Sequence, residues 1–532
     1  MRAGIAAIAV FLCLTAAGAA PAPAQVKTLV FCSRASPDSF NPQLSVSQTT
    51  FDATSRQVYD QLVTVRPGSA EPVAALAESW RVSEDGLEYV FRLRPGVTFH
   101  TTRSFRPTRT MNADDVLFSI LRQLDRKHPW HKISGGDYRY FRGMGLAELI
   151  ESVTASDKMT VTFRLSRPSA SFLAILAMDF ASILSAEYAA AMLEAETPER
   201  LDREPVGTGP FMLVQYQRDA LIRYVAHRTY WRGPAALDNL VFAITPDPSV
   251  RLQKLRDGEC HVIDQPDPAD LPTVMTDAAV LVKRQTAADL GYLAFNTRKR
   301  FLNDVRVRRA LSLAIDREAI VDRAYGGMGV VAANLLPPGL WPNGDHTKPH
   351  KPDPERARAI LAEAGYDKLS FEIWISPVSR PYMPSARRIA ELIRADWAAI
   401  GVDATIIAPN WEQFLKRSMV GEHEAILFGW IAETLDPDVF LAPILDCEAA
   451  RKGANRTFWC DPGLDRALLE ARQSTDRAER AALYGIALEI LDKQVPLLPL
   501  AHSVSFTPIR REVVNYEASP LGGHFFYGVD LR

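Results

Sequence analysis

The sequence predicts an α/β protein built of at least two lobes. The chain has 532 residues, which is more than a single hydrophobic core usually organises. Strand and helix patterns alternate along it, without internal repeats or a low-complexity linker. A strand–helix–strand run in the second half is typical of parallel sheets. Together these observations favour one folded body of interleaved α/β lobes.

The composition supports an ordered core and excludes two classes of partner. Hydrophobic residues make up 47% of the chain and aromatic residues 9%. The 61 lysines and arginines nearly balance the 63 aspartates and glutamates. Such a balance indicates neither nucleic acid nor an anionic membrane surface as a partner. Any ligand must therefore be recognised by local features.

Residues 1–24 are predicted to be a secretory signal peptide. Arg2 precedes an apolar run over 5–20, and a small-x-small cleavage site ends at Ala24. Bulky residues precede Cys13, which does not suit a lipoprotein cysteine. No later stretch approaches about 18 uninterrupted apolar residues, the length that spans a membrane. We therefore expect an exported, soluble mature protein.

Removal of that segment would leave four cysteines in a compartment that permits disulfides: Cys32, Cys260, Cys447 and Cys460. Four cysteines allow three pairings. Cys447 and Cys460 enclose only a short loop, which favours a local bridge between them and leaves Cys32 to pair with Cys260. A zinc site is the alternative, which neither the spacing nor neighbouring histidines support.

Two elements are predicted in the first half. Residues 80–82 and 89–91 flank Asp85 and Gly86, and such a pair accepts the positive φ angles of a hairpin turn. Further on, Asn112 is a candidate N-cap for a helix that runs through Leu124. The apolar residues of this helix recur at Val116, Leu117, Ile120, Leu121 and Leu124, and Asp114 and Asp115 would stabilise its dipole.

The second half begins with a helix and a strand. Asp353 and Pro354 are typical of a helix start, and Gly365 of its end. Alternating apolar residues over 369–375 then predict a strand that stops at Pro377.

A helical stripe over 389–400 follows, and 402–407 returns as a second strand. The unit is βαβ, so we expect parallel strands and a right-handed crossover. A short polar helix over 412–419 and a buried strand over 425–428 complete the pattern.

Three side chains follow the carboxyl ends of these predicted strands: Arg380, Trp411 and Glu433. In open α/β sheets, ligands bind beyond the carboxyl ends of the strands. If the strands are neighbours, an arginine, a tryptophan and a glutamate converge on one rim. Asp436 and Asp438, close behind Glu433, are instead expected to shape the loop by capping backbone amides.

Motifs spread over nearly the whole mature chain resemble those of one family. They are KTLVFCS from Lys27, FNPQL from Phe40, SEDG from Ser83, MNADDVLFS from Met111, GTGPF from Gly207, GYLAFN from Gly291 and RPYMP from Arg380. The sequence resembles the periplasmic dipeptide-binding proteins of bacterial ABC importers. These belong to family 5 of the extracellular solute-binding proteins, the oligopeptide, dipeptide and nickel class.

The resemblance implies a Venus-flytrap fold, in which two α/β lobes close over a ligand and the first lobe carries an additional subdomain. Residues 25–285 would form lobe one with this subdomain, and 286–502 would form lobe two. Residues 503–532 would return to lobe one. The crossings would lie near Thr286 and His502.

The resemblance also implies roles for the site residues. In the family an arginine takes the ligand carboxylate, which falls on Arg380, and an aspartate takes its ammonium, which falls on Glu433. Tyr382, Trp411 and Trp430 are expected to line the same cleft. The charges would have to be separated by the length of the ligand, and two extended residues span roughly 7 Å. A guanidinium suits a carboxylate because its planar fork can pair with both oxygens.

The implied function is that of a periplasmic solute-binding component. We expect a monomer that binds dipeptides or short peptides, delivers them to an ABC permease in the inner membrane, needs no cofactor or metal and is not an enzyme. Carriage of haem, cationic peptides or other peptide-like ligands is the alternative within the family.

A secreted hydrolase is the alternative outside the family, but the sequence has no GxSxG, HExxH or CxxC motif. The GTGP stretch from Gly207 lacks the lysine of a phosphate-binding loop. His128 and His131 could bind metal or haem, yet Pro129 lies between them and disfavours a helix, so a surface loop is expected.

Overall fold

The structure is a computed structural model that describes residues 26–66, 71–338, 340–341, 350–366 and 368–532. The predicted signal peptide therefore lies outside the described residues. Within these ranges no helix has the length and apolar character needed to cross a membrane.

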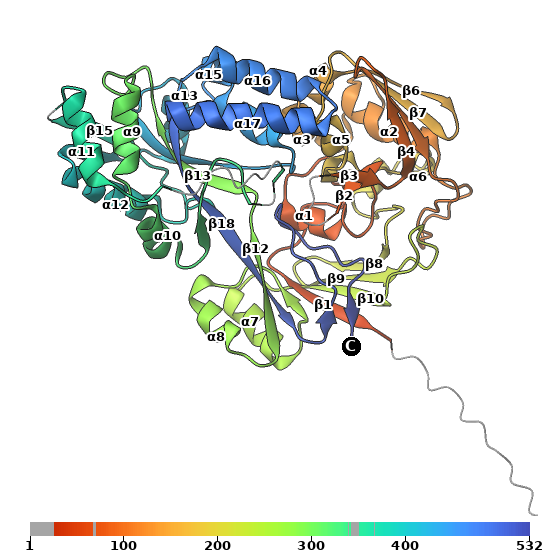
Figure 1. The fold of residues 1–532 in the computed structure, drawn as a ribbon. Helices are drawn as coiled ribbons and strands as arrows, with labels where there is room; N and C mark the ends of the chain where they lie inside the picture. The colour runs from red at the N-terminus through yellow and green to blue at the C-terminus, as the bar shows by residue number, and fades with distance from the viewer. Residues whose placement is uncertain (1–25, 67–70, 339, 342–349, 367) are drawn as a thin grey trace, which may run out of the picture.

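Two lobes share one large sheet (Figure 1), with strand order β16-β15-β17-β13-β18-β11-β1-β10-β9-β8. The strands on the lobe-two side are β16 Val402–Ile407, β15 Leu369–Trp374, β17 Ala425–Ile431 and β13 Asp289–Phe295. Those on the lobe-one side are β11 Val262–Ile263, β1 Thr28–Ser33, β10 Asn239–Ile244, β9 Leu221–Ala226 and β8 Phe211–Gln217.

The long strand β18, Leu497–Arg510, belongs to both lobes. Its first residues pair with β13, and its last residues pair with β12, Val280–Thr286. The short strand β14, Gly329–Val331, pairs with the residues of β18 between these two regions, 501–503. At the break between β12 and β13, the Asp289 carboxylate accepts hydrogen bonds from the Ser503 amide at 2.8 Å and its hydroxyl at 2.5 Å. Two strands thus cross between the lobes side by side.

The additional subdomain is a four-stranded antiparallel sheet of order β4-β5-β7-β6. Its strands are β4 Ala77–Val82, β5 Glu88–Leu93, β7 Thr160–Leu165 and β6 Ile150–Asp157. The predicted hairpin is β4–β5, and Gly86 in its turn has a φ of 68°. The predicted helix is α2, Ala113–Leu124, and Asn112 and Asp115 form a complete capping box at its start. Both predictions are confirmed.

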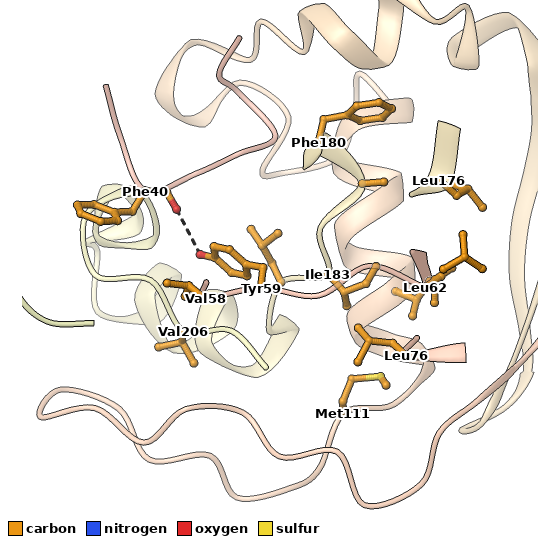
Figure 2. Packing of buried hydrophobic residues seen from close by; sticks show 14 of the residues in the cluster. Phe40, Val58, Tyr59, Leu62, Leu76, Met111, Leu176, Phe180, Ile183 and Val206 are labelled. Atoms are coloured by element: carbon orange, nitrogen blue, oxygen red, sulfur yellow. Dashed lines mark hydrogen bonds between the residues drawn. The ribbon is translucent and has the colours of Figure 1, made fainter. Parts of the chain in front are cut away.

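The core of lobe one is drawn in Figure 2, where apolar side chains from distant parts of the chain surround Tyr59. The Tyr59 hydroxyl donates to the Phe40 carbonyl at 3.4 Å. Gly207 and Gly209 lie against this segment so closely that a Cβ would stand 1.9 Å from the Val58 oxygen and 2.6 Å from the Val58 carbonyl carbon, respectively. The GTGP stretch therefore serves close backbone packing.

The predicted βαβ unit is confirmed. Strands β15 and β16 pair in parallel, and helix α12, Ala386–Ala399, connects them. Helix α11, Pro354–Glu363, starts at the cap Asp353. The predicted polar helix is α13, Trp411–Met419. Strand β17 neighbours β15 as expected but runs on to Ile431, because its last residues keep pairing with β13.

Both faces of the lobe-two sheet are covered, since residues of β13 alternate between two cores. Leu293 and Phe295 pack with α9 to α12, whereas Tyr292 and Ala294 pack with α13, α14, α16 and α17. These last helices are α14 Pro437–Leu445, α16 Pro462–Gln473 and α17 Arg477–Gln494.

The remaining elements are short. The helices are α1 Gln48–Ala53, α3 Arg139–Gly143, α4 Leu146–Leu149, α5 Phe172–Leu176, α6 Ala186–Glu194, α7 Pro248–Asp257, α8 Leu271–Met275, α9 Val305–Leu313, α10 Arg317–Tyr325 and α15 Cys447–Lys452. The 3-10 turns are η1 Ile133–Gly135, η2 Asp179–Ala181, η3 Pro198–Asp202 and η4 Pro268–Asp270, and the strands are β2 Val63–Val65, β3 Pro72–Ala74, β19 Val513–Val514 and β20 Asp530–Leu531.

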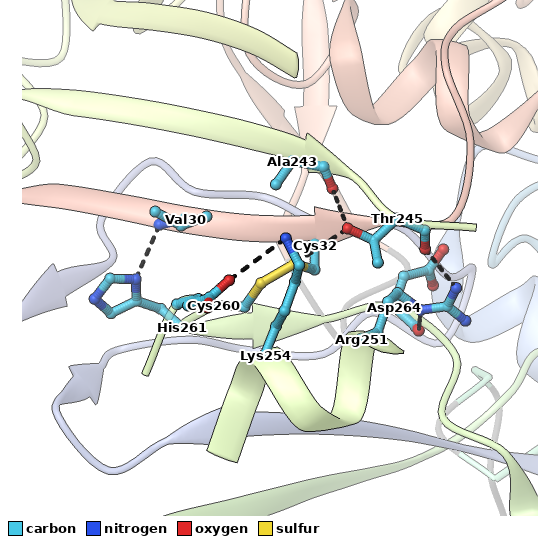
Figure 3. The surroundings of a disulfide bond; sticks show 10 residues. Val30, Cys32, Ala243, Thr245, Arg251, Lys254, Cys260, His261 and Asp264 are labelled. Atoms are coloured by element: carbon cyan, nitrogen blue, oxygen red, sulfur yellow. Dashed lines mark hydrogen bonds and ion pairs between the residues drawn. A yellow bond between two sulfur atoms is a disulfide. The ribbon is translucent and has the colours of Figure 1, made fainter. Parts of the chain in front are cut away.

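The structure contains both predicted disulfides. Cys447 is bonded to Cys460, and Cys32 to Cys260. Figure 3 shows the second bond between β1 and the segment that follows α7, where the His261 ring accepts a hydrogen bond from the Val30 amide at 3.0 Å. The bond therefore joins this segment to the sheet of lobe one, at a small core of its own.

Asp436 and Asp438 have structural roles, with one difference from the prediction. Asp436 is the N-cap of α14 and accepts a hydrogen bond from the Asp438 amide at 3.0 Å, as expected of a capping residue. Asp438 does not cap but pairs with Arg472 of α16 at 3.0 Å. Asp436 also pairs with Arg480 of α17 at 2.7 Å. The two carboxylates thus bind α14 to the α16–α17 hairpin.

Candidate functional site

A cleft of about 460 Å³ lies between the two lobes. Lobe two contributes the segment 431–435, which leaves the end of β17. Lobe one contributes polar side chains from several elements, including Gln48, Ser55, Arg56, Asp60, Tyr140 and Asp179. The carboxyl-terminal tail closes one side with Ser519, Leu521, Gly522, Phe525 and Tyr527.

Glu433 is half-buried in this cleft. Its position is fixed because the neighbouring Ala432 amide donates to the Ala288 carbonyl at 2.7 Å, which anchors the segment beside β13. Burial raises the pKa of the Glu433 carboxyl, a hydrogen bond from the Tyr140 hydroxyl lowers it, and Asp179 raises it further. No cation of the described chain compensates this carboxylate.

The Tyr140 side chain reaches Glu433 from the opposite lobe. Its ring is stacked on Phe180, with centroids 6.2 Å apart, and lies 5.8 Å from Phe51. Burial, Glu433 and Asp179 all raise the pKa of the Tyr140 hydroxyl, so it remains a neutral donor.

Asp179 belongs to a charged cluster on the lobe-one wall. Its carboxylate accepts from the Ser55 hydroxyl at 2.6 Å and pairs with Arg56 at 3.2 Å. Arg56 also pairs with Asp52 at 2.6 Å. Only 6% of the Arg56 side chain is exposed, whereas 25% of the Asp179 side chain is.

Arg380 lies beyond the end of β15, and its guanidinium stacks on the Trp411 ring, 4.7 Å from the centroid. Trp411 is the first residue of α13, whose N-cap is Asn410. The Arg380 Nε is buried and has no hydrogen-bond partner in the described part of the chain. The predicted contact of an arginine and a tryptophan at one rim is therefore present, and the guanidinium keeps donors to offer.

Tyr382 and Trp430 lie next to this rim. The Tyr382 ring occupies the space above Gly429, where a Cβ would stand 2.1 Å from the ring, and its carbonyl accepts from the Tyr325 hydroxyl at 2.7 Å. Trp430 lies inside β17, opposite Leu290, and packs against a lobe-two core. Its indole nitrogen is buried without a partner among the described residues.

The structure thus brings the predicted residues together only in part. Glu433 lines the cleft, whereas Arg380, Tyr382, Trp411 and Trp430 are not among the residues that line it. Sequence reasoning missed Tyr140, Asp179 and Arg56. No local signal marks them, because they meet Glu433 only through the packing of two lobes.

The alternative sites receive no support. In the described ranges, no group of three or more histidine, cysteine, aspartate or glutamate side chains could hold a metal ion. His128 and His131 lie in the turn after α2, as predicted, where the His131 ring bonds to the Arg122 carbonyl at 2.8 Å. Neither histidine lines the cleft.

Comparison with known proteins defines the class. The profile described as "Bacterial extracellular solute-binding proteins, family 5 Middle" matches residues 71–452, which is more than half of the chain. The protein therefore belongs to family 5 of the bacterial extracellular solute-binding proteins, a family of transport components and not of enzymes.

Individual relatives cover nearly the whole chain. It is 48% identical to the dipeptide-binding protein of Escherichia coli over 512 residues, 96% of each chain. It is 45% identical to heme-binding protein A of Haemophilus influenzae over 505 residues, 95% of this chain and 92% of that one.

Solved structures agree with the fold. HbpA2 of Haemophilus parasuis has a TM-score of 0.93 at 42% identity, covering 95% of this chain and all (100%) of that one. A dipeptide-binding protein of Pseudoalteromonas in complex with Met-Leu has a TM-score of 0.73 at 38% identity, with the same coverage. The predicted two-lobed fold with its additional subdomain is confirmed.

Proposed function

We propose that the protein binds dipeptides or short peptides by their charged termini in the periplasm and delivers them to an ABC permease of the inner membrane. One observation carries this proposal. Glu433, an anion, and Arg380, a cation, both lie beyond the ends of strands in lobe two. Neither has a partner of opposite charge in the described part of the chain. A zwitterionic peptide supplies both missing charges.

In this assignment Glu433 holds the ligand ammonium and Arg380 its carboxylate. The Trp411 ring stacks on the guanidinium. Tyr382 and Trp430, which do not line the cleft in this structure, would join its lining when the lobes close. At 4 Å and an effective dielectric of 20, each pair would attract by on the order of 4 kcal/mol before desolvation is subtracted. The named ligands of relatives support the class, since one is a dipeptide-binding protein and another holds Met-Leu.

The assignment requires the lobes to close, because Arg380 does not line the cleft in the present arrangement. We propose lobe one at 25–285 with a return at 503–532, lobe two at 286–502, and bending at the two crossings. A signal peptide over 1–24 and action as a monomer complete the proposal.

Calorimetric titration of two variants tests the assignment. Glu433→Gln should weaken a dipeptide by about 2 to 5 kcal/mol, because the ammonium is left desolvated and unpaired. It should weaken the N-acetylated dipeptide far less, since that ligand has no ammonium. Arg380→Met should show the mirror pattern, with a larger loss for the free acid than for the amide.

Glu433→Asp is the matched control, since it keeps the charge on a side chain one methylene shorter. Equal losses for blocked and unblocked peptides would show that Glu433 only shapes the loop and that the ammonium is held elsewhere.

Haem carriage is a second candidate, favoured by the 45% identity to heme-binding protein A. A visible absorption spectrum of purified protein with added haemin distinguishes the two. A stoichiometric shift of the haemin band that dipeptide does not displace would favour haem; an unchanged spectrum would remove this candidate.

A further inference from the structure

A second carboxylate, Asp179, faces the same part of the cleft as Glu433 but comes from the opposite lobe. Both residues line the cleft, as do Tyr140 and Arg56. The two carboxyls are close enough for Asp179 to disfavour the ionised form of Glu433. The Tyr140 hydroxyl, which bonds to Glu433, is under the influence of Asp179 as well.

The position of Asp179 is set by its neighbours. It starts the 3-10 turn η2, Asp179–Ala181, three residues after the end of the apolar helix α5. One of its oxygens accepts from Ser55 and the other pairs with Arg56. Arg56 is itself fixed by Asp52 and lies over the Phe525 ring, 5.1 Å from its centroid. The carboxylate is therefore held rigidly, yet a quarter of its side chain, 25%, stays exposed to the cleft.

The charges at this point do not balance. Asp52, Asp179 and Glu433 are three carboxylates, and Arg56 is the arginine that lies among them. Arg56 is shared between two of the three, and Glu433 receives only a neutral hydroxyl. Like charges at close range in a partly buried site repel each other, and a cation placed between them removes the repulsion.

We propose that Asp179 is a second contact for the cationic end of the ligand and a determinant of specificity. This inference rests on the proposed function, in which Glu433 holds the ammonium. The ammonium would lie between a carboxylate of each lobe and replace the Tyr140 hydroxyl as partner of Glu433. A cation would then favour the closed form, because it joins two walls that otherwise repel each other. The ligands selected are peptides with a free amino terminus, and an analogue of equal shape that lacks the ammonium binds without closing the lobes fully.

Calorimetric titration of Asp179→Asn tests the contact, with Ala-Leu and its des-amino analogue propionyl-leucine as ligands. Ala-Leu should bind about tenfold more weakly to the variant, because a partly exposed charge pair is lost. Propionyl-leucine should bind equally well or better. Asp52→Asn is the matched control, since it also removes a partner of Arg56 but does not line the cleft. It should change both affinities by the same factor.

Equal weakening of both ligands by Asp179→Asn would overturn the inference. The proposed function would still stand if Glu433→Gln separated the two ligands in the same assay, and it would fall with the inference if neither variant separated them.

A second measurement on the unmodified protein is independent of folding defects in the variants. Small-angle scattering at saturating ligand should show a smaller radius of gyration with Ala-Leu than with propionyl-leucine. Equal contraction with both ligands would contradict the coupling of the cation to closure.

Discussion

At the scale of single residues, Gly429 shows how the backbone makes room for the site. Gly429 and Gly291 are paired on neighbouring strands, and Tyr382 occupies the space above both. A Cβ on Gly291 would stand 2.2 Å from the Tyr382 carbonyl oxygen. The two glycines thus let the segment that carries Arg380 pack directly on the sheet, next to the strand that leads to Glu433.

The raised pKa of Glu433 gives a pH dependence to ligand binding. Peptide ammonium binds the ionised carboxylate, so affinity should fall as the pH drops through the raised pKa, which lies above the ordinary value of 4.5. The groups around Glu433 are Tyr140, which stays neutral, and Asp179, which Arg56 holds in an ion pair. Titration between pH 7 and pH 5 should show weaker binding at the acid end, with a proton released on binding.

Glu433→Gln should bind with little pH dependence over this range, because the carboxyl that titrates is gone. The same slope in wild type and variant would assign the titrating group to another residue.

At the scale of elements, one carboxylate stabilises the start of α14 through two interactions. Asp436 caps the helix and also pairs with Arg480, whose side chain is only 9% exposed. Asp436→Ala should lower the free energy of unfolding by about 1 kcal/mol for the lost cap and by about 3 to 5 kcal/mol for the buried arginine that loses its paired carboxylate. Asp436→Asn keeps a capping oxygen but not the charge, so it should recover only the contribution of the cap to the free energy of unfolding. Urea unfolding measures both losses. Near-complete recovery of the free energy of unfolding in Asp436→Asn would show that the cap, not the ion pair, dominates.

Elements with local signals were predictable from the sequence, and those defined by packing were not. The capping box at Asn112 and the apolar alternation of β15 are local, so α2 and the βαβ unit were predicted with nearly correct bounds. Strand β18 contains Pro499 and Pro508, which argue against a central strand, yet it is the strand that joins both lobes. Gly429 likewise indicates the end of a strand, although β17 continues through it.

The residues of the candidate site were likewise predictable only where a local sequence signal marks them. Arg380, Trp411 and Glu433 could be found because each follows a strand of one sheet. Tyr140 and Asp179 come from the other lobe, and their place depends on how the lobes pack, which no pattern in the chain encodes.

At the scale of the whole molecule, three buried histidines link stability to pH. His100 lies in lobe one, His423 in lobe two and His502 at the crossing strand, and burial lowers their pKa values to about 3, about 4 and about 4. One ring nitrogen of each bonds to a backbone carbonyl, and the other has no partner in the described ranges. A second proton would therefore be buried unpaired in every one.

The unfolded chain takes up these protons near pH 6.5, so the folded protein should lose stability as the pH falls from 6.5 towards 4. Each histidine should contribute about 1.4 kcal/mol per pH unit inside that window. Urea unfolding at pH 7, 6 and 5 measures the slope, and His423→Gln should reduce it. An unchanged slope in the variant would show that His423 does not titrate on unfolding.

The return of the tail has a consequence for how the chain can be cut and rejoined. Lys27 and Asp530 form an ion pair at 2.6 Å, so both ends of the described chain meet on lobe one, as Figure 1 shows beside β1. The same fold should therefore form from a circularly permuted chain. Joining residue 532 to residue 26 with a short linker should permit new chain ends at an exposed turn of lobe two. In such a circular permutant lobe one would be translated without interruption, and a fluorescent reporter fused at the new ends would report on the lobe closure proposed above.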